Sequence, residues 1–166
     1  LLLLPARLTR RKNIALGLHV LAAIRHAFEQ EYRRIVTGPP GPHNPANPGY
    51  LRELLDLRQE LGLENAVHFL YELSDPPMFI DDDTMANLYQ ISDALFFPST
   101  QEGFGIPMLE AGFAGLPIFC SDITPFRETG GEDVTYFDPL NEPAADIAAR
   151  ILSTLIASPT ARLRVR

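Results

Sequence analysis

Short, almost continuously apolar runs alternate with segments of helical periodicity along the 166-residue chain. Such runs are typical of strands that are buried on both faces of a sheet. They predict strands at Leu1–Leu4, Arg34–Thr37, Ala66–Leu70, Ala94–Phe97, Pro117–Cys120 and Val134–Phe137. The segments between them predict helices at about Asn13–Phe28, Tyr50–Leu61, Thr84–Ile91, Pro107–Gly115, Thr124–Glu128 and Glu142–Ala157.

The alternation of strands and helices predicts an α/β fold of the Rossmann-like, doubly wound class, with a parallel sheet of about six strands. The common strand order in this class is 3-2-1-4-5-6, and ligands bind where the order reverses, between strands 1 and 4. The segment after the first strand is basic and contains Arg7 and Lys12, whereas the segment after the fourth contains Glu102 and Glu110. We therefore expect these two segments to face each other across one crevice.

The segment after the fourth strand also has the features of a phosphate-binding helix start. A Gly-Phe-Gly turn at residues 103–105 precedes Pro107, which favours the first turn of a helix. A helix N-terminus presents free backbone N–H groups and the positive end of its dipole, which suit a phosphate. Glu102 and Glu110 flank this start. The pattern indicates that they hold hydroxyl groups of a phosphorylated ligand such as a nucleotide sugar.

Composition and charge narrow the classes of function. The net charge of −7 disfavours wholesale nucleic-acid binding. The single cysteine, Cys120, excludes an internal disulfide and fits a reducing compartment. No apolar run approaches the ~20 residues that a membrane span needs, and the initial leucines are too few for a signal peptide. We expect one cytoplasmic domain, and both chain ends resemble truncated elements, which indicates a piece excised from a longer protein.

The spacing Arg-x-x-x-x-Lys at Arg7 and Lys12, together with Glu102-GFGIPML-Glu110, resembles a known family. The chain is similar to the carboxy-terminal domain of retaining glycosyltransferases with the GT-B fold, and most of all to family four, the glycosyl transferases group 1. The resemblance implies that residues 1–166 form a nucleotide-sugar-binding domain and that an amino-terminal acceptor domain is absent. The activity it implies is transfer of a hexose from a UDP- or GDP-sugar to an acceptor hydroxyl, with retention at the anomeric carbon.

The resemblance also implies roles for the charged residues. Arg7 and Lys12 would neutralise the donor diphosphate, so that no metal and no other cofactor is expected. Glu102 would hydrogen-bond hydroxyls of the transferred sugar, and Glu110 would hold the ribose. An arginine gives a fixed bidentate fork and a lysine a movable point charge, which suits both to a diphosphate.

Further donor contacts follow from the same resemblance. The backbone N–H groups of Gly103, Phe104 and Gly105 would contact the sugar and the phosphates, and Gly38 would approach the phosphates closely. Leu109 would pack near the nucleoside, and Leu70 and Tyr71 would lie beside the base. Many relatives carry glycine at the position of Tyr71, so the contact with the base is where this chain departs from the family pattern.

Other polar clusters have simpler interpretations. Asp81, Asp82 and Asp83 can bind a divalent cation, but they precede a helix, where acidic residues favour the cap and the dipole. The Gly-Phe-Gly turn lacks the third glycine of a dinucleotide fingerprint, since position 108 is Met108. Of the four histidines, His43 is the candidate for lining the cleft, because it lies in the proline- and glycine-rich segment 38–49.

Two other classes of function stay open beside the transferase. One is a related GT-B enzyme, such as a nucleotide-sugar epimerase or a phosphorylase; a phosphorylase needs a lysine for pyridoxal phosphate, and Lys12 is the only lysine. The other is a nucleotide-sugar-binding module without catalysis. Because a GT-B site closes between two domains, we expect the isolated chain to bind a donor nucleotide sugar without turnover.

Overall fold

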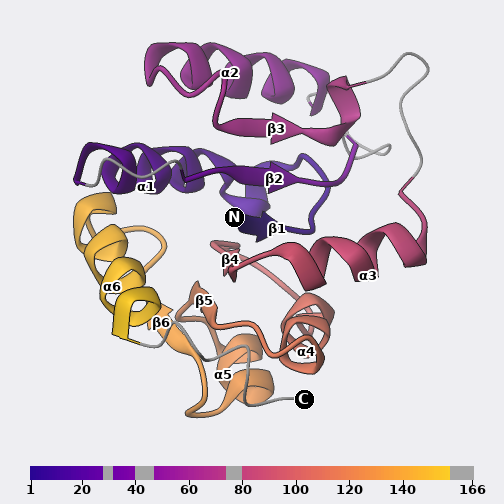
Figure 1. The fold of residues 1–166 in the computed structure, drawn as a ribbon, viewed down its shortest axis with the longest axis vertical. Coiled ribbons are helices and arrows are strands. Elements are labelled where there is room, and N and C mark those ends of the chain that lie inside the picture. The colour runs from indigo at the N-terminus through magenta and orange to yellow at the C-terminus, as the bar shows by residue number, and fades with distance from the viewer. Residues whose placement is uncertain (28–31, 40–46, 74–79, 158–166) are drawn as a thin grey trace.

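A computed structural model describes residues 1–27, 32–39, 47–73 and 80–157 (Figure 1). In these ranges six strands form one parallel sheet of order β3-β2-β1-β4-β5-β6, as predicted. The strands are β1 (Leu2–Leu4), β2 (Arg34–Val36), β3 (Val67–Phe69), β4 (Ala94–Phe97), β5 (Ile118–Ser121) and β6 (Thr135–Phe137). The central strands β1, β4 and β5 are buried along their whole length, which explains why all of their residues except Ser121 are apolar.

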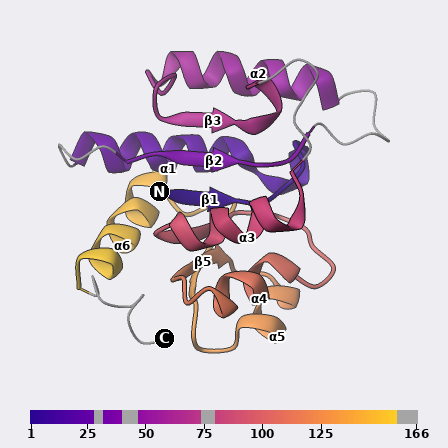
Figure 2. The same ribbon diagram turned by 45° about the vertical axis from the view of Figure 1, so that its right-hand side comes forward.

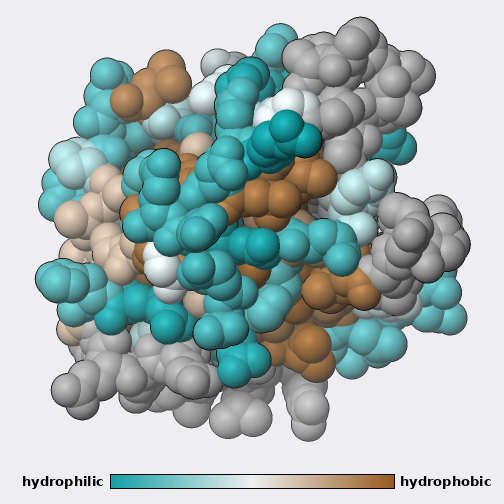
Figure 3. Space-filling view, turned by 90° about the horizontal axis from the view of Figure 1, so that it is seen from above, coloured by the Kyte–Doolittle hydropathy of each residue, from teal (hydrophilic) through white to brown (hydrophobic). Residues whose placement is uncertain are grey.

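Helices cover both faces of the sheet (Figures 1 and 2). They are α1 (Ile14–Ala27), α2 (Asn47–Glu60), α3 (Asp82–Ile91), α4 (Ile106–Phe113), α5 (Thr124–Gly130) and α6 (Ala144–Ala157), with short 3-10 turns η1 (Arg10–Lys12) and η2 (Leu70–Glu72). Helix α1 packs against α2 and α6, whereas α4 packs against α5. The face of the molecule seen from above in Figure 3, over α2, is mostly hydrophilic, as expected of an outer helix.

Aromatic side chains connect the sheet to its edge strand and to α5. The rings of Phe96 and Phe137 stack with centroids 5.1 Å apart, and Phe97 stacks on Phe126 at 4.9 Å. Cys120 lies in the same core, and burial raises the pKa of its thiol to about 12. No helix in the described ranges is both long and apolar enough to cross a membrane.

Several predicted boundaries were wrong by a few residues. Helix α2 begins at Asn47 rather than Tyr50, and α6 begins at Ala144 rather than Glu142. The cap of α3 is Asp81, whose carboxylate accepts a hydrogen bond from the backbone N–H of Thr84 at 2.8 Å.

Glu142 stays outside α6 because its carboxylate accepts hydrogen bonds from the Arg150 side chain and from the backbone N–H of Asp138. Leu70, expected at the end of a strand, instead starts η2. The predicted end of the first helix at Phe28, and His43, lie outside the described residues.

A fully buried arginine lies at the start of β2, where the sequence predicted only a short apolar strand. The Arg34 guanidinium lies 4.8 Å from the ring centroid of Phe96. It donates to the backbone carbonyls of Gly17 (3.3 Å) and Phe96 (3.4 Å), and burial lowers its pKa to about 9. A Cβ on Gly17 would lie 2.4 Å from the Arg34 Cζ. The glycine therefore makes the space that the arginine occupies.

Replacing Gly17 with alanine is expected to lower the free energy of unfolding by about 2 kcal/mol, since overpacking outweighs the gain of about 1 kcal/mol in helix propensity. Denaturant unfolding measures the loss. The double variant Gly17→Ala/Arg34→Met is the control, because a methionine can bend away from the new methyl group and does not bury a charge. Recovery of stability in the double variant is expected; a Gly17→Ala protein as stable as the wild type would contradict the packing argument.

Candidate functional site

The loops that follow β1 and β4 lie against each other, as the strand order predicts. The backbone N–H of Thr100 donates to the carbonyl of Arg11 at 2.8 Å, and the Thr100 hydroxyl donates to the same oxygen at 3.3 Å. Arg11 in turn donates to the carbonyl of Gln101 at 3.2 Å. These contacts hold the basic segment and the glutamate segment together at the carboxyl edge of the sheet.

An ion pair joins the two loops at their centre. The Lys12 ammonium contacts Glu102 Oε1, and the Arg11 guanidinium lies 3.4 Å from Glu102 Oε2. Only 11% of the Lys12 side chain and 10% of the Glu102 side chain are exposed, whereas half of Arg11 is exposed. Lys12 also lies 5.0 Å from the ring centroid of Phe97. The structure therefore holds a nearly dry cation and anion side by side, and their mutual attraction is weakly screened.

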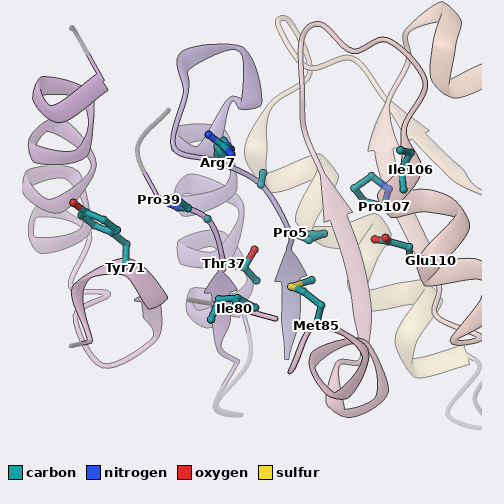
Figure 4. Close-up of a pocket in the computed structure, with 12 residues that line it drawn as sticks. Pro5, Arg7, Thr37, Pro39, Tyr71, Ile80, Met85, Ile106, Pro107 and Glu110 are labelled. Atoms are coloured by element: carbon teal, nitrogen blue, oxygen red, sulfur yellow. The ribbon is translucent and has the colours of Figure 1, made fainter. Parts of the chain in front are cut away.

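A cavity of about 540 Å³ opens at the carboxyl ends of β1 and β2 (Figure 4). Four of the predicted site residues line it from four different segments: Arg7, Gly38, Tyr71 and Glu110. In Figure 4, Arg7 and Glu110 lie on opposite sides of the opening, and Tyr71 lies furthest from Glu110. The other lining residues are Pro5, Ala6, Thr37, Pro39, Ile80, Met85, Ile106 and Pro107.

The N-terminus of α4 forms one wall of this cavity. Gly105, the N-cap residue, has φ 92° and makes no side-chain cap, so no capping side chain covers the first turn of α4. A Cβ on Gly105 would lie 3.1 Å from the Phe126 ring, so both the backbone conformation and the space favour glycine. Pro107 follows in the first turn and lines the cavity. The positive end of the α4 dipole is therefore available to an anion in the cavity.

The structure explains why residue 38 is a glycine, which the sequence alone did not indicate. Its backbone N–H donates to the Ala6 carbonyl at 3.1 Å. A Cβ at this position would lie 2.6 Å from that oxygen and 2.8 Å from the Arg7 Cα. Glycine thus lets the end of β2 lie directly against the backbone that carries Arg7. A close approach of Gly38 to a phosphate stays a prediction.

The remaining predicted residues lie around the cavity rather than in its lining. Gly103 and Phe104 are exposed on the turn before α4, with 57% of Phe104 accessible to solvent. Leu109 is 41% exposed on α4, and Leu70 is buried at the start of η2. Their expected contacts with a donor stay predictions.

The sequence did not single out two residues that the structure places at the site. Arg11 contacts Glu102 beside Lys12, and the hydroxyl of Tyr89 on α3 donates to Glu110 at 2.6 Å. Arg11 stood out only as part of a basic run, while nothing in the spacing of α3 distinguished Tyr89 from a core tyrosine.

The histidines within the described ranges and the aspartate run at residues 81–83 do not line the 540 Å³ cavity. His19 and His26 are exposed on α1, and His68 is half-buried on β3. Asp81 caps α3 as described above. Among the described residues, no group of three or more His, Cys, Asp or Glu side chains is arranged to hold a metal ion.

Comparison of the sequence with known families and proteins gives a consistent result. The family model described as glycosyl transferases group 1 matches residues 1–164. The serotype-specific mannosyltransferase WbdA of Escherichia coli is 42% identical over 72 residues, which are 43% of this chain and 9% of that protein. The O-antigen chain mannosyltransferase RfbU of Salmonella typhimurium is 33% identical over 106 residues, 64% of this chain and 28% of that protein. The chain therefore spans less than a third of either relative.

Solved structures share the fold. A glycosyltransferase from Rickettsia africae ESF-5 superposes with a TM-score of 0.77 at 22% identity, covering 97% of this chain and 39% of that one. Anabaena Alr3699/HepE in complex with UDP-glucose superposes with a TM-score of 0.71 at 23% identity, covering 99% of this chain and 41% of that one. The sheet order matches the Rossmann-like half of GT-B enzymes. Because the family model covers almost every residue, the chain belongs to the glycosyl transferases group 1 family.

Proposed function

We propose that this chain is the donor-binding domain of a retaining glycosyltransferase, which transfers a hexose from a nucleoside-diphosphate sugar to an acceptor hydroxyl. The observation that carries the proposal is the 540 Å³ cavity, because it joins Arg7, the N-terminus of α4 and Glu110 in one opening, at the sheet edge where the loops that carry Lys12 and Glu102 meet. A cationic side, a helix N-terminus and a carboxylate suit the diphosphate and the ribose of a nucleotide. We assign the acceptor site to a further domain of the full-length protein.

Each charged residue has a proposed part in transfer. Arg7, Lys12 and the α4 N-terminus stabilise the charge that develops on the leaving diphosphate, so that the protein supplies by itself what a metal ion supplies in other enzymes. Lys12 is already desolvated by its position between Glu102 and Phe97, which strengthens its attraction to a phosphate oxygen. Glu102 then holds hydroxyls of the transferred sugar, and Glu110 holds those of the ribose.

A hexose donor is supported by the names of the relatives. WbdA and RfbU are mannosyltransferases, and the Anabaena structure contains UDP-glucose. Beyond these names, the cavity lining favours a nucleoside in general rather than one base, because Ile80 and Met85 are apolar and Tyr71 offers an aromatic ring.

The proposal is tested by giving the full-length protein UDP-, GDP- and ADP-hexoses with candidate acceptor glycans. We expect one donor to support transfer, and proton NMR to show that the product keeps the anomeric configuration of the donor. An inverted product would contradict retention, and an epimerised nucleotide sugar formed without acceptor would identify the epimerase alternative. The 166-residue chain alone is expected to show no transfer; turnover by it would contradict the assignment of the acceptor site to another domain.

A further inference from the structure

Glu110 lies between two cavities on the surface of α4. On one side it lines the 540 Å³ cavity with Arg7 and Pro107, and on the other it lines a second cavity of about 410 Å³ between α3 and α4. Met85 also lines both cavities, whereas Tyr89 lines only the second. Tyr89 therefore approaches Glu110 from behind, as viewed from the first cavity.

The contact between Tyr89 and Glu110 is short and sheltered. The phenol donates to Glu110 Oε2 at 2.6 Å, and its oxygen also lies 3.5 Å from the Pro107 carbonyl. Tyr89 is 4% exposed. Burial and the neighbouring carboxylate raise the pKa of Tyr89 above its usual range, so the phenol keeps the proton that it donates. The other carboxylate oxygen, Oε1, has no hydrogen bond within the part of the chain that the structure describes.

This arrangement restricts a side chain that would otherwise be free. Glutamate has three side-chain torsions, and an exposed glutamate on a helix samples many rotamers. A charge-assisted hydrogen bond from a rigid, buried ring fixes one oxygen and leaves the other for a ligand. Tyr89 itself does not line the first cavity, so its effect on a ligand there passes through Glu110.

From this geometry we infer that Tyr89 is a positioning residue for nucleotide binding: it orients the Glu110 carboxylate toward the ribose hydroxyls of the bound nucleotide. The inference rests on the proposed function, because it takes Glu110 to be the residue that holds the ribose. Tyr89 therefore contributes to the affinity for a ribonucleotide without touching it, and it contributes nothing to the affinity for a nucleotide that lacks both ribose hydroxyls.

The test compares ribose and dideoxyribose ligands. Wild type and Tyr89→Phe are titrated calorimetrically with UDP, GDP and ADP and with their 2′,3′-dideoxy analogues. Phenylalanine keeps the buried ring and removes only the hydroxyl. For the nucleotide that binds, we expect Tyr89→Phe to weaken the ribose form about five- to tenfold, the effect of about one net hydrogen bond, and to leave the dideoxy form unchanged.

A matched control is Tyr136→Phe on β6. The Tyr136 hydroxyl also makes structural hydrogen bonds, to the carbonyls of Phe126 (3.0 Å) and Gly131 (2.9 Å), but it lies outside both cavity linings. We expect Tyr136→Phe to bind the ribose and the dideoxyribose forms of the nucleotide with the same affinities as the wild type.

The outcomes separate the inference from the proposed function. Suppose that the wild type prefers the ribose form, but that Tyr89→Phe weakens binding of both forms equally or of neither. That result would overturn the inference and leave the proposed function intact. A wild type that binds no nucleotide, or that binds both forms equally, would overturn the ribose role of Glu110 and the inference with it.

Discussion

Replacing Lys12 with methionine in the full-length protein is expected to lower kcat for sugar transfer about a hundred- to a thousandfold, the usual effect of removing one group that stabilises transition-state charge. Methionine replaces most of the apolar stem of the lysine side chain and removes the ammonium that lies over the Phe97 ring, so the group that is lost is the charged one. The donor KM should rise less than kcat falls, because charge on the leaving diphosphate develops fully only in the transition state.

The second effect of this substitution is on Glu102, which loses its buried counterion and, among the described residues, keeps only the half-exposed Arg11 as a cationic partner. Thermal unfolding separates this effect from the loss of the catalytic charge. If the uncompensated Glu102 destabilises the fold, Lys12→Met should unfold at a lower temperature than the wild type, and Lys12→Met/Glu102→Gln should recover that stability. We expect kcat at saturating donor to stay low in Lys12→Met at temperatures where the variant is fully folded, and a fully folded variant with the wild-type kcat would contradict the role of Lys12. Arg52→Met, which removes an exposed cation from α2, is the matched control and should leave kcat unchanged.

Replacing Gly38 with alanine is expected to lower the free energy of unfolding by about 2–3 kcal/mol and to weaken nucleotide binding about tenfold, because the loop that carries Arg7 moves from the position in which Arg7 lines the cavity. The new Cβ would lie 2.6 Å from the Ala6 carbonyl oxygen and 2.8 Å from the Arg7 Cα. Both neighbours are backbone, so they cannot move aside as a side-chain tip can. The loop that carries Arg7 has to shift.

Urea unfolding and calorimetric titration with the nucleotide that binds would measure the two effects in the same preparation. Gly49→Ala on α2 is the control, because a Cβ there meets nothing within 4 Å, and it is expected to be neutral or slightly stabilising. Full affinity in Gly38→Ala would show that the Arg7 loop does not depend on this contact.

The sheet order and the position of the crevice were predictable from the sequence, because both follow from general rules of α/β folds rather than from details of packing. Continuous apolar runs indicated a parallel sheet, and the rule for the switch point placed the loop with Lys12 opposite the loop with Glu102. The structure confirms that these loops meet, through the Lys12–Glu102 contact itself.

Pairs of residues that meet across elements were not predictable. The periodicity of α3 shows that Tyr89 faces inward, but it does not show that Glu110, on another helix, lies opposite its hydroxyl. The packing of Arg34 against Gly17 was not predictable either, because the pattern of a strand does not indicate that a glycine on a helix leaves space for a guanidinium.

The account depends most directly on whether the cavity between Arg7 and Glu110 binds a nucleotide. Isothermal titration of the 166-residue chain with UDP, GDP and ADP tests this, with Arg7→Gln as the site variant and Arg52→Gln as the matched control. We expect one of the three nucleotides to bind with one-to-one stoichiometry, and Arg7→Gln, but not Arg52→Gln, to weaken it at least about tenfold. Absence of binding by all three, or equal affinity in the two variants, would contradict the account.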